Sequence, residues 1–207
     1  MIDLDKHFSK ISQVQLKKFN SLIQLYKSWN SKVNLISRRD IDNLYVNHIL
    51  HSLSIAKIHE FIDGTDVLDV GTGGGLPGIP LAIIFPNVNF TLLDSISKKI
   101  KVVEEISKQL SLTNVRTVND RAENHSQKYD FVISRAVSKM DTFYSIVNKN
   151  IKLKSRNNIP NGIITLKGGD LEHELQNFNK YKIFEISDFF SNDFFKTKKI
   201  VFIPYSN

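Results

Sequence analysis

The sequence contains no cysteine and no long apolar run. The absence of cysteine excludes disulfide bonds and a cysteine nucleophile, and it suits a reducing compartment. The longest uninterrupted apolar run, LAIIF at 81–85, is far too short to cross a bilayer. The first ten residues, MIDLDKHFSK, lack the basic region and the apolar stretch of a signal peptide. We therefore expect a cytoplasmic protein that does not associate with membranes.

Acidic residues are the minority charge, with 21 Asp and Glu against 28 Lys and Arg, which gives a net charge of +7. Basic residues cluster at 97–101, 149–156 and 196–199, and Arg38 is followed by Arg39. A basic surface is expected of a protein that binds nucleic acid. Mutational bias explains the same excess, because Lys, Asn and Ile are abundant together throughout the chain. Composition alone leaves both explanations open.

The first 60 residues have the pattern of helices. Apolar residues recur at three- and four-residue steps, which is the stripe of an amphipathic helix. The stripe consists of Phe8, Ile11, Val14, Phe19, Leu22, Ile23, Tyr26 and Trp29. A second helix is expected from about Asp40, with Leu44, Tyr45, His48 and Leu53 facing inward. We expect residues 1–63 to form a helical extension, and residues 64–207 to form the core domain.

After Gly64, short apolar or β-branched runs alternate with helical patterns. Strands are expected at 67–70, 90–94, 115–119, 130–134 and 162–167, and helices at 76–86, 97–110 and 138–150. This alternation predicts an α/β fold with a parallel, doubly wound sheet. The runs at 182–187 and 199–205 have only a loop between them, which predicts a hairpin with an antiparallel final strand.

The most informative stretch is DVGTGGGLPGIPLA at 69–82, which follows the first expected strand. Ligands of doubly wound sheets bind beside this strand, and glycines let a ligand approach the backbone closely. Gly73, Gly75 and Gly78 form the Gly-x-Gly-x-x-Gly pattern of dinucleotide-binding proteins. Asp94 ends the next strand, 23 residues after Gly71. Its carboxylate is placed to accept hydrogen bonds from both hydroxyls of a ribose.

Two cofactors carry such a ribose, NAD(P) and S-adenosylmethionine. A pyrophosphate requires free backbone N–H groups at a helix N-terminus. Pro77 and Pro80 remove two of these donors, so the turn favours S-adenosylmethionine. Asp69, just before the glycines, either orients the turn or attracts the methionine ammonium. The segments DRAEN (120–124) and ISRA (133–136) follow the third and fourth strands, where an adenine ring and the mouth of the site are expected.

Seven motifs occur in order along the chain: WNSKVNLIS (29–37), HILHSL (48–53), DVGTGGGLPGIPLA, LLDSISKK (92–99), DRAE, ISRA and TLKGG (165–169). With these motifs the chain resembles the bacterial small-subunit rRNA methyltransferases that modify N7 of a guanine in the decoding-centre loop of 16S rRNA. The resemblance implies a Rossmann-like class I methyltransferase with a seven-stranded, mostly parallel sheet, an antiparallel last strand and an N-terminal helical extension. It implies S-adenosyl-L-methionine as cofactor, and 16S rRNA, the small ribosomal subunit or its precursor as partner. We expect a monomer with no metal.

The resemblance also assigns residues. It implies that Gly71, Gly73 and Leu76 line the cofactor turn, and that Ala122 and Glu123 hold the adenine. It places Arg135 beside both the transferred methyl group and the incoming base, as a catalytic and cofactor-binding residue. Asp94 as the ribose partner follows from the spacing argument above.

The chain departs from the family pattern in the second motif. The family often has Arg before the position of His48 and Asp at the position of His51, where this chain has Asn47 and His51. If the usual arginine touches RNA, Asn47 does not replace its charge. His48 and His51 are spaced like metal ligands, but no carboxylate or cysteine is close in the sequence to complete a site.

The residue types are consistent with N7 chemistry. Methylation at C5 of a pyrimidine normally needs a cysteine, and methylation of an exocyclic amine usually needs an Asn/Asp-Pro-Pro-aromatic loop; the chain has neither. Guanine N7 presents a free lone pair, so in-line displacement needs no general base or covalent intermediate, and positioning dominates catalysis.

Several alternatives stay open at this point. Arg135 either holds the guanine O6 or supports the cofactor carboxylate, and Lys167 is either a phosphate contact or a solvated lysine. An NAD(P)-dependent oxidoreductase, a non-catalytic RNA-binding protein and a small-molecule methyltransferase are the rival functions.

Overall fold

The computed structural model describes residues 3–37, 40–135 and 139–205. Its centre is a seven-stranded sheet with the order β3-β2-β1-β4-β5-β7-β6. The strands are β1 (Asp66–Val70), β2 (Asn89–Asp94), β3 (Val115–Asn119), β4 (Phe131–Arg135), β5 (Gly162–Gly168), β6 (Lys182–Glu185) and β7 (Lys198–Pro204). Strands β1 to β5 pair in parallel, whereas β7 pairs antiparallel with both β5 and β6. The predicted α/β fold with an antiparallel last strand is confirmed.

The α-helices are α1 (Gln13–Asn30), α2 (His51–Leu53), α3 (Ile55–Ile58), α4 (Gly78–Ile84), α5 (Ser97–Gln109), α6 (Met140–Val147) and α7 (Glu172–Leu175). Short 3-10 helices are η1 (Leu4–Lys6), η2 (Ile41–Asn43), η4 (Asn148–Asn150), η5 (Ile186–Asp188) and η6 (Asp193–Thr197), and η3 (Leu44–Leu50) is a π-helix. One expectation was wrong in detail: the segment between β6 and β7 is not only a loop, because it contains η5 and η6.

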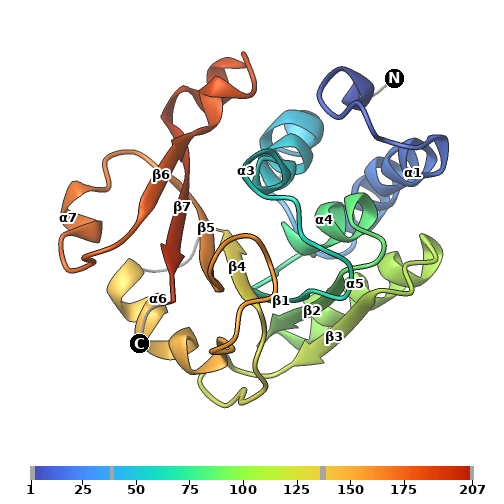
Figure 1. Ribbon diagram of the computed structural model, residues 1–207. Coiled ribbons are helices and arrows are strands. Elements are labelled where there is room, and N and C mark those ends of the chain that lie inside the picture. Colours follow the sequence, from blue (N-terminus) through green and yellow to red (C-terminus); the bar gives the residue numbers. More distant parts are fainter. Residues whose placement is uncertain (1–2, 38–39, 136–138, 206–207) are drawn as a thin grey trace.

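Helices cover both faces of the sheet (Figure 1). Successive side chains of a strand point to opposite faces. Val67 and Leu92 belong to one core together with side chains of α1, α4 and α5. Leu68 and Leu93 belong to a second core together with side chains of α6 and α7. Asp69 lies between Leu68 and Val70 in β1, so its carboxylate points to the face that α4 covers.

Helix α1 begins with a capping box. The Ser12 hydroxyl accepts a hydrogen bond from the Gln15 backbone N–H, and the Gln15 side chain accepts one from the Ser12 N–H. Phe19, Leu22 and Tyr26 of this helix are fully buried, as expected. Val14, however, is 64% exposed, so its inward assignment was wrong. Five residues at about 100° each place Val14 about 140° around the helix from Phe19, which is away from the core.

The N-terminal helices pack against the helices that cover one face of the sheet: α1 contacts α4 and α5, and α2 contacts α4. Leu22 of α1 and Leu53 of α2 lie in the same hydrophobic core as Ile79 of α4. The division into an extension at 1–63 and a core at 64–207 stays a prediction. The packing places α1 and η3 next to the carboxyl ends of the central strands, where the candidate site lies.

Candidate functional site

The turn between β1 and α4 uses its glycines in two ways. Gly71, Gly73 and Gly75 have positive φ angles of 67°, 58° and 90°, which only glycine adopts without strain. A Cβ built on Gly71 meets no atom within 4 Å, so this backbone faces open space. In contrast, a Cβ on Gly75 lies 2.4 Å from Ile79 Cδ1, and a Cβ on Gly78 lies 2.1 Å from Leu92 Cδ2. The first part of the turn leaves room for a ligand, and the second part packs tightly.

Asp69 holds this turn from inside the protein. Its Oδ2 accepts hydrogen bonds from the Thr72 hydroxyl at 2.6 Å and from the Gly78 backbone N–H at 2.9 Å. Asp69 is completely buried, and its Oδ1 has no hydrogen-bond partner among the described residues. Burial raises the pKa of Asp69 to about 7. Of the two roles considered for this carboxylate, the contacts support orientation of the turn.

The first turn of α4 has little to offer a pyrophosphate. The Gly78 N–H donates to Asp69, the Ile79 N–H donates to the Gly75 carbonyl, and the Leu81 N–H donates to the Pro77 carbonyl. Pro80 has no N–H. Anion-binding helix termini need unengaged N–H groups. The geometry therefore disfavours a dinucleotide, as the two prolines predicted.

Asp94 lies at the carboxyl end of β2, beside the open part of the turn. Its Oδ2 accepts a hydrogen bond from the Gly73 N–H at 2.9 Å, and its Oδ1 accepts one from the Ile96 N–H at 2.8 Å. A carboxylate oxygen accepts more than one hydrogen bond, so capacity for two ribose hydroxyls remains. Ile96 is 48% exposed and offers an apolar surface next to Asp94. No pattern in the sequence indicated this position.

The other predicted cofactor residues follow neighbouring strands. Ala122 and Glu123 lie in the turn after β3, whose last residue pairs with Asp94 in the sheet. Ala122 is half-buried against the second core, and Glu123 is exposed. Leu76 has a buried side chain in the first core, so a contact with a ligand would come from its backbone. The predicted residues thus line the carboxyl edge of β3, β2 and β1 in that order.

Arg135 is the last residue of β4, on the other side of β1. Ala136, which completes the ISRA motif, lies outside the described residues, as do Arg38 and Arg39. The guanidinium makes no hydrogen bond to any described residue. Burial lowers the pKa of Arg135 below its ordinary value, while Tyr26, Asp69 and Asp40 act to raise it. A buried cation with no hydrogen-bond partner among the described residues is suited to a polar or anionic ligand.

Arg135 borders a cavity of about 350 Å³ that no sequence pattern indicated. Its described lining is formed by Asp40, Asn47, His48, His51, Arg135, Leu166, Lys167, Gly168, Phe194 and Lys198. The volume lies at the lower end of the range of small-molecule pockets. The cavity lies between the π-helix η3 and the carboxyl ends of β4 and β5. Because β4 is the neighbour of β1 in the sheet, the cavity lies next to the glycine turn that follows β1.

A hydrogen-bonded cluster forms one wall of the cavity. Asp40 Oδ1 accepts a hydrogen bond from Asn47 Nδ2 at 2.6 Å, and Asp40 Oδ2 pairs with His48 Nε2. The expectation that no carboxylate lies near His48 was therefore wrong, because the chain folds back over eight residues to bring Asp40 to the ring. No group of three potential metal-ligating side chains forms within 3–37, 40–135 and 139–205.

His51 forms the back of the cavity as a neutral ring. Burial and the nearby charges of Arg135 and Lys198 lower the pKa of His51 to about 3. The ring packs edge-on against Phe194 and Phe195. His51 is therefore uncharged at physiological pH, unlike the aspartate that the family often has there.

Lys167 and Tyr26 also contact the site. Lys167 forms an ion pair with Glu174 and has a side chain that is only 9% exposed, so it is not a solvated lysine. Tyr26 of α1 donates a buried hydrogen bond to the Gly74 carbonyl at 2.8 Å, which ties the N-terminal helix to the glycine turn. The sequence showed Tyr26 only as part of an apolar stripe and gave no signal for this contact.

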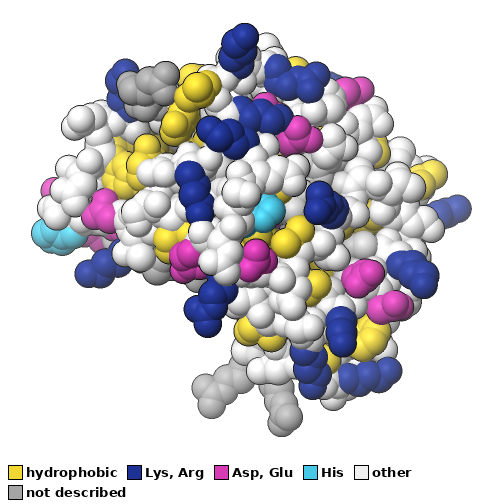
Figure 2. Space-filling view, turned by 90° about the horizontal axis from the view of Figure 1, so that it is seen from below, with side chains coloured by type: hydrophobic (Ala, Val, Ile, Leu, Met, Phe, Trp, Pro, Cys, Tyr) yellow, Lys and Arg dark blue, Asp and Glu magenta, His cyan; other side chains and the backbone are white. Residues whose placement is uncertain are grey.

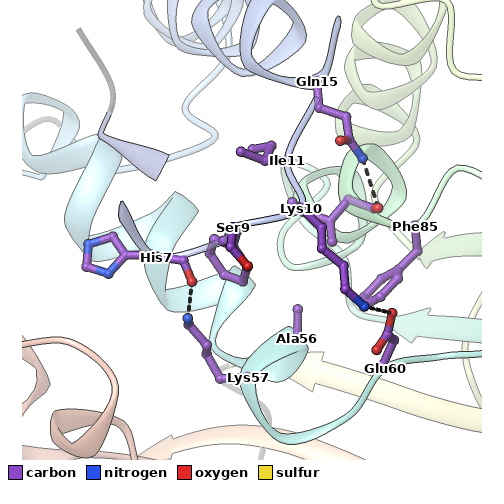
Figure 3. Close-up of a pocket in the computed structure, with 11 residues that line it drawn as sticks. His7, Ser9, Lys10, Ile11, Gln15, Ala56, Lys57, Glu60 and Phe85 are labelled. Carbon is purple, nitrogen blue, oxygen red and sulfur yellow. Dashed lines mark hydrogen bonds and ion pairs between the residues drawn. The ribbon is translucent and has the colours of Figure 1, made fainter. Parts of the chain in front are cut away.

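A second hollow lies away from these residues (Figure 3). It is lined by the segment before α1, by α3 and by the end of α4, including Lys57 and Phe85. Because α4 starts at the carboxyl edge of the sheet and runs back, its end lies at the opposite edge. None of the predicted site residues borders this hollow.

On the face of the molecule shown in Figure 2, basic and acidic side chains are mixed. Figure 2 shows Lys and Arg side chains spread over the face in view, with Asp and Glu side chains between them, rather than a single basic patch. None of the helices in the described part of the chain has the length and apolar character required to cross a membrane.

The open backbone at Gly71, the carboxylate of Asp94 and the engaged helix terminus fit an adenosine with a short polar tail better than a pyrophosphate. Solved structures agree on the fold. A SAM-dependent methyltransferase from Aquifex aeolicus matches with a TM-score of 0.55 and 15% identity, covering 73% of this chain and 87% of that chain. The fold is that of the class I S-adenosylmethionine-dependent methyltransferases.

The family follows from sequence comparison. The family model described as "GidB: rRNA small subunit methyltransferase G" matches residues 15–200. "Ribosomal RNA small subunit methyltransferase G" of Flavobacterium psychrophilum is 52% identical over 99% of this chain and 98% of its own length. The protein of the same name from Christiangramia forsetii is 52% identical over 97% of this chain and 95% of its own length. The chain belongs to this methyltransferase family, which confirms the resemblance carried by its motifs.

Proposed function

We propose that the protein transfers a methyl group from S-adenosyl-L-methionine to N7 of a guanine in the decoding-centre loop of 16S rRNA. The observation that carries this proposal is the membership of nearly the whole chain in the rRNA methyltransferase family, together with a site whose elements fit that cofactor. We further propose that the enzyme acts in the cytoplasm as a monomer, on 16S rRNA within the small subunit or its precursor.

The cofactor would lie along the carboxyl edge of β1, β2 and β3. Gly71 and Gly73 leave the backbone open for its methionine portion, and Leu76 follows in the same turn. Asp94 would accept hydrogen bonds from the ribose hydroxyls. Ala122 and Glu123 would hold the adenine, with Ile96 as an additional apolar contact. When bound, S-adenosylmethionine supplies an electrophilic methyl group on a sulfonium.

The chain's own residues would act by positioning. N7 carries its lone pair in the plane of the ring, so no proton has to be removed before the S–CH₃ bond breaks and the N7–CH₃ bond forms. The site needs only to hold the base in line, and orientation of two bound reactants supplies roughly 7–11 kcal/mol at best. Arg135 lies between the glycine turn and the cavity, where it would contact the incoming base or the cofactor carboxylate.

The experiment that tests the proposal is to delete the gene and to map N7-methylguanosine in 16S rRNA by chemical cleavage. The deletion is expected to abolish one N7-methylguanosine, and a plasmid copy of the gene is expected to restore it. An unchanged map would overturn the substrate assignment. Incorporation of labelled methyl groups by the purified protein separates an enzyme from an RNA-binding protein that uses the same scaffold.

A further inference from the structure

Asp40 is a charged residue that lines the cavity, and the proposed transfer of the methyl group does not by itself require it. Its side chain is 32% exposed, and it is held in one orientation by Asn47 and His48. Burial raises the pKa of Asp40, but the hydrogen bonds from Asn47 and His48 and the charge of Arg135 outweigh this effect and lower it below its ordinary value. The carboxylate is therefore ionised and uses two of its roughly four acceptor positions within the protein.

The cavity thus contains an acceptor that is oriented by its neighbours, Asp40, and a donor, Arg135. Asp40 accepts hydrogen bonds only, whereas Arg135 donates only. Arg135 ends β4, which pairs with β1 in the register Asp69 to Ile133, so it lies beside the start of the glycine turn. It also lines the same cavity as Asp40. The site therefore has the order glycine turn, donor, acceptor.

Guanine presents groups in the complementary order. Along the edge of the base, the N7 lone pair is followed by the O6 acceptor and then by the N1–H and N2–H₂ donors. Adenine has the opposite polarity: it has an amino donor where guanine has O6, and an N1 acceptor where guanine has N1–H. A base whose N7 faces the glycine turn would bring O6 to Arg135 and its N1 and N2 donors to Asp40.

We infer that the cavity between η3 and the ends of β4 and β5 receives the target guanine, and that Asp40 is the residue that selects guanine by accepting hydrogen bonds from N1–H and N2–H₂. Enzymes that modify a single base commonly read its Watson–Crick edge in this way. Asn47 acts on specificity through Asp40 as a positioning residue. This inference rests on the proposed methylation of guanine N7.

The arrangement also favours the reaction itself. Methyl transfer moves the positive charge from sulfur to the guanine ring, and the ring hydrogens at N1 and N2 become stronger donors. A carboxylate that accepts from them binds the transition state more tightly than the substrate, which is the requirement for an interaction that accelerates the chemical step. The role of Asn47, where the family often has arginine, is then to orient an acid rather than to contact phosphate.

The test compares guanosine with inosine, which keeps N7, O6 and N1–H but lacks the N2 amino group. Small subunits are reconstituted with ligated 16S rRNA that carries either nucleoside at the methylated position. We expect the kcat/KM of the wild-type protein to be lower for inosine than for guanosine by about tenfold, because one hydrogen bond to a charged acceptor is lost. In Asp40→Asn this preference is expected to fall close to one, together with a lower rate on guanosine.

Asp42→Asn serves as the matched control, because Asp42 is an exposed acid two residues along the chain. It should keep the wild-type preference, and Asn47→Ala should show an intermediate one. Titration with S-adenosylhomocysteine verifies that each variant is folded. If Asp40→Asn does not fold, the test uses the preference for guanosine over inosine of the wild-type protein and of Asn47→Ala.

A wild-type protein that methylates both substrates equally, or an Asp40→Asn protein with an undiminished preference, would overturn the inference. Failure of the wild-type protein to methylate the guanosine substrate at all would instead overturn the proposed function, and the inference with it. The two failures appear in different arms of the experiment and are therefore distinguishable.

Discussion

The two halves of the site are built in different ways. The half proposed to bind the cofactor, here called the cofactor half, consists mostly of backbone. The acids that support it, Asp69 and Asp94, accept hydrogen bonds from N–H groups or from a hydroxyl of the turn. The cavity half consists of side chains with charges, and its arginine has no hydrogen bond to a described residue. A preorganised backbone fits one invariant ligand, whereas charged side chains in a cavity provide a means of choosing between similar ligands. Variants in each half should therefore fail in different ways.

The largest effect is expected in the cavity half. Arg135→Ala should lower the rate of methyl transfer by about 100- to 1,000-fold, because it removes an oriented cation next to the reacting groups. The fold should stay intact, since the guanidinium makes no hydrogen bond to the described structure. The rate is measured by transfer of labelled methyl groups to small subunits, and folding by thermal unfolding.

Binding of S-adenosylhomocysteine to Arg135→Ala separates the two roles of this residue. Unchanged affinity would assign the guanidinium to the base, and lost affinity would assign it to the carboxylate of the methionine portion. Normal turnover of the variant would remove Arg135 from the site.

Asp69, which holds the turn of the cofactor half from inside, should act on stability rather than on turnover. Burial raises the pKa of Asp69 to about 7 in the folded state, from an ordinary value of 3.8. The folded state therefore binds the proton more tightly, and the stability from this group is lost as the pH rises from about 4 through about 7. Asp69→Asn lacks this titration, and its single oxygen can accept both hydrogen bonds that Oδ2 accepts.

The measurement is urea unfolding of both proteins at about pH 4.5 and about pH 7.5. Relative to Asp69→Asn, the wild-type protein should lose about 3 kcal/mol of unfolding free energy between the two conditions. If the difference in unfolding free energy between the two proteins is the same at both pH values, the carboxylate of Asp69 does not titrate in this range.

Two glycines of the turn separate ligand binding from packing within the cofactor half. Gly71→Ala places a Cβ in open space at a φ of 67°, so it should cost about 1–2 kcal/mol in strain and should weaken binding of S-adenosylhomocysteine. Gly78→Ala places a Cβ 2.1 Å from Leu92 Cδ2, so it should destabilise the fold by about 1–3 kcal/mol through overpacking. Calorimetric titration and thermal unfolding are run on both variants. Full affinity in Gly71→Ala would argue against a ligand at that backbone.

The smallest effect is expected where α1 meets the turn. Tyr26→Phe removes the hydrogen bond to the Gly74 carbonyl and should lower the unfolding free energy by about 1 kcal/mol. Affinity for S-adenosylhomocysteine should fall only slightly, because Gly74 is buried and does not face the open part of the turn. An undiminished unfolding free energy would show that the N-terminal helix does not brace the turn.

The difference between the two halves also explains which parts of the site could be predicted from the sequence. The glycine turn and Asp94 belong to one strand-turn-helix-strand unit, so their proximity follows from local patterns and from the known order of such units. The strands were placed to within two residues, because each is a short apolar run bounded by turn residues. The choice of cofactor rested on Pro77 and Pro80, and the engaged N–H groups of α4 support it.

The cavity half could not be predicted in the same way. Asp40 and Arg135 are almost 100 residues apart, and their proximity depends on how the N-terminal helices pack against the rest of the fold. The outward position of Val14, in contrast, was predictable, because helix geometry alone places it about 140° around the helix from the buried Phe19. Tyr26 was recognised as buried, but its hydrogen bond to the turn depends on tertiary packing that no pattern encodes.

The measurement that tests the account most directly is a crystal structure with S-adenosylhomocysteine bound. The ligand is expected to lie over Gly71, with its ribose hydroxyls within hydrogen-bonding distance of the Asp94 carboxylate and its sulfur facing the cavity that Arg135 borders. A ligand found in the hollow of Figure 3 or elsewhere on the surface, or no binding at millimolar concentration, would contradict it.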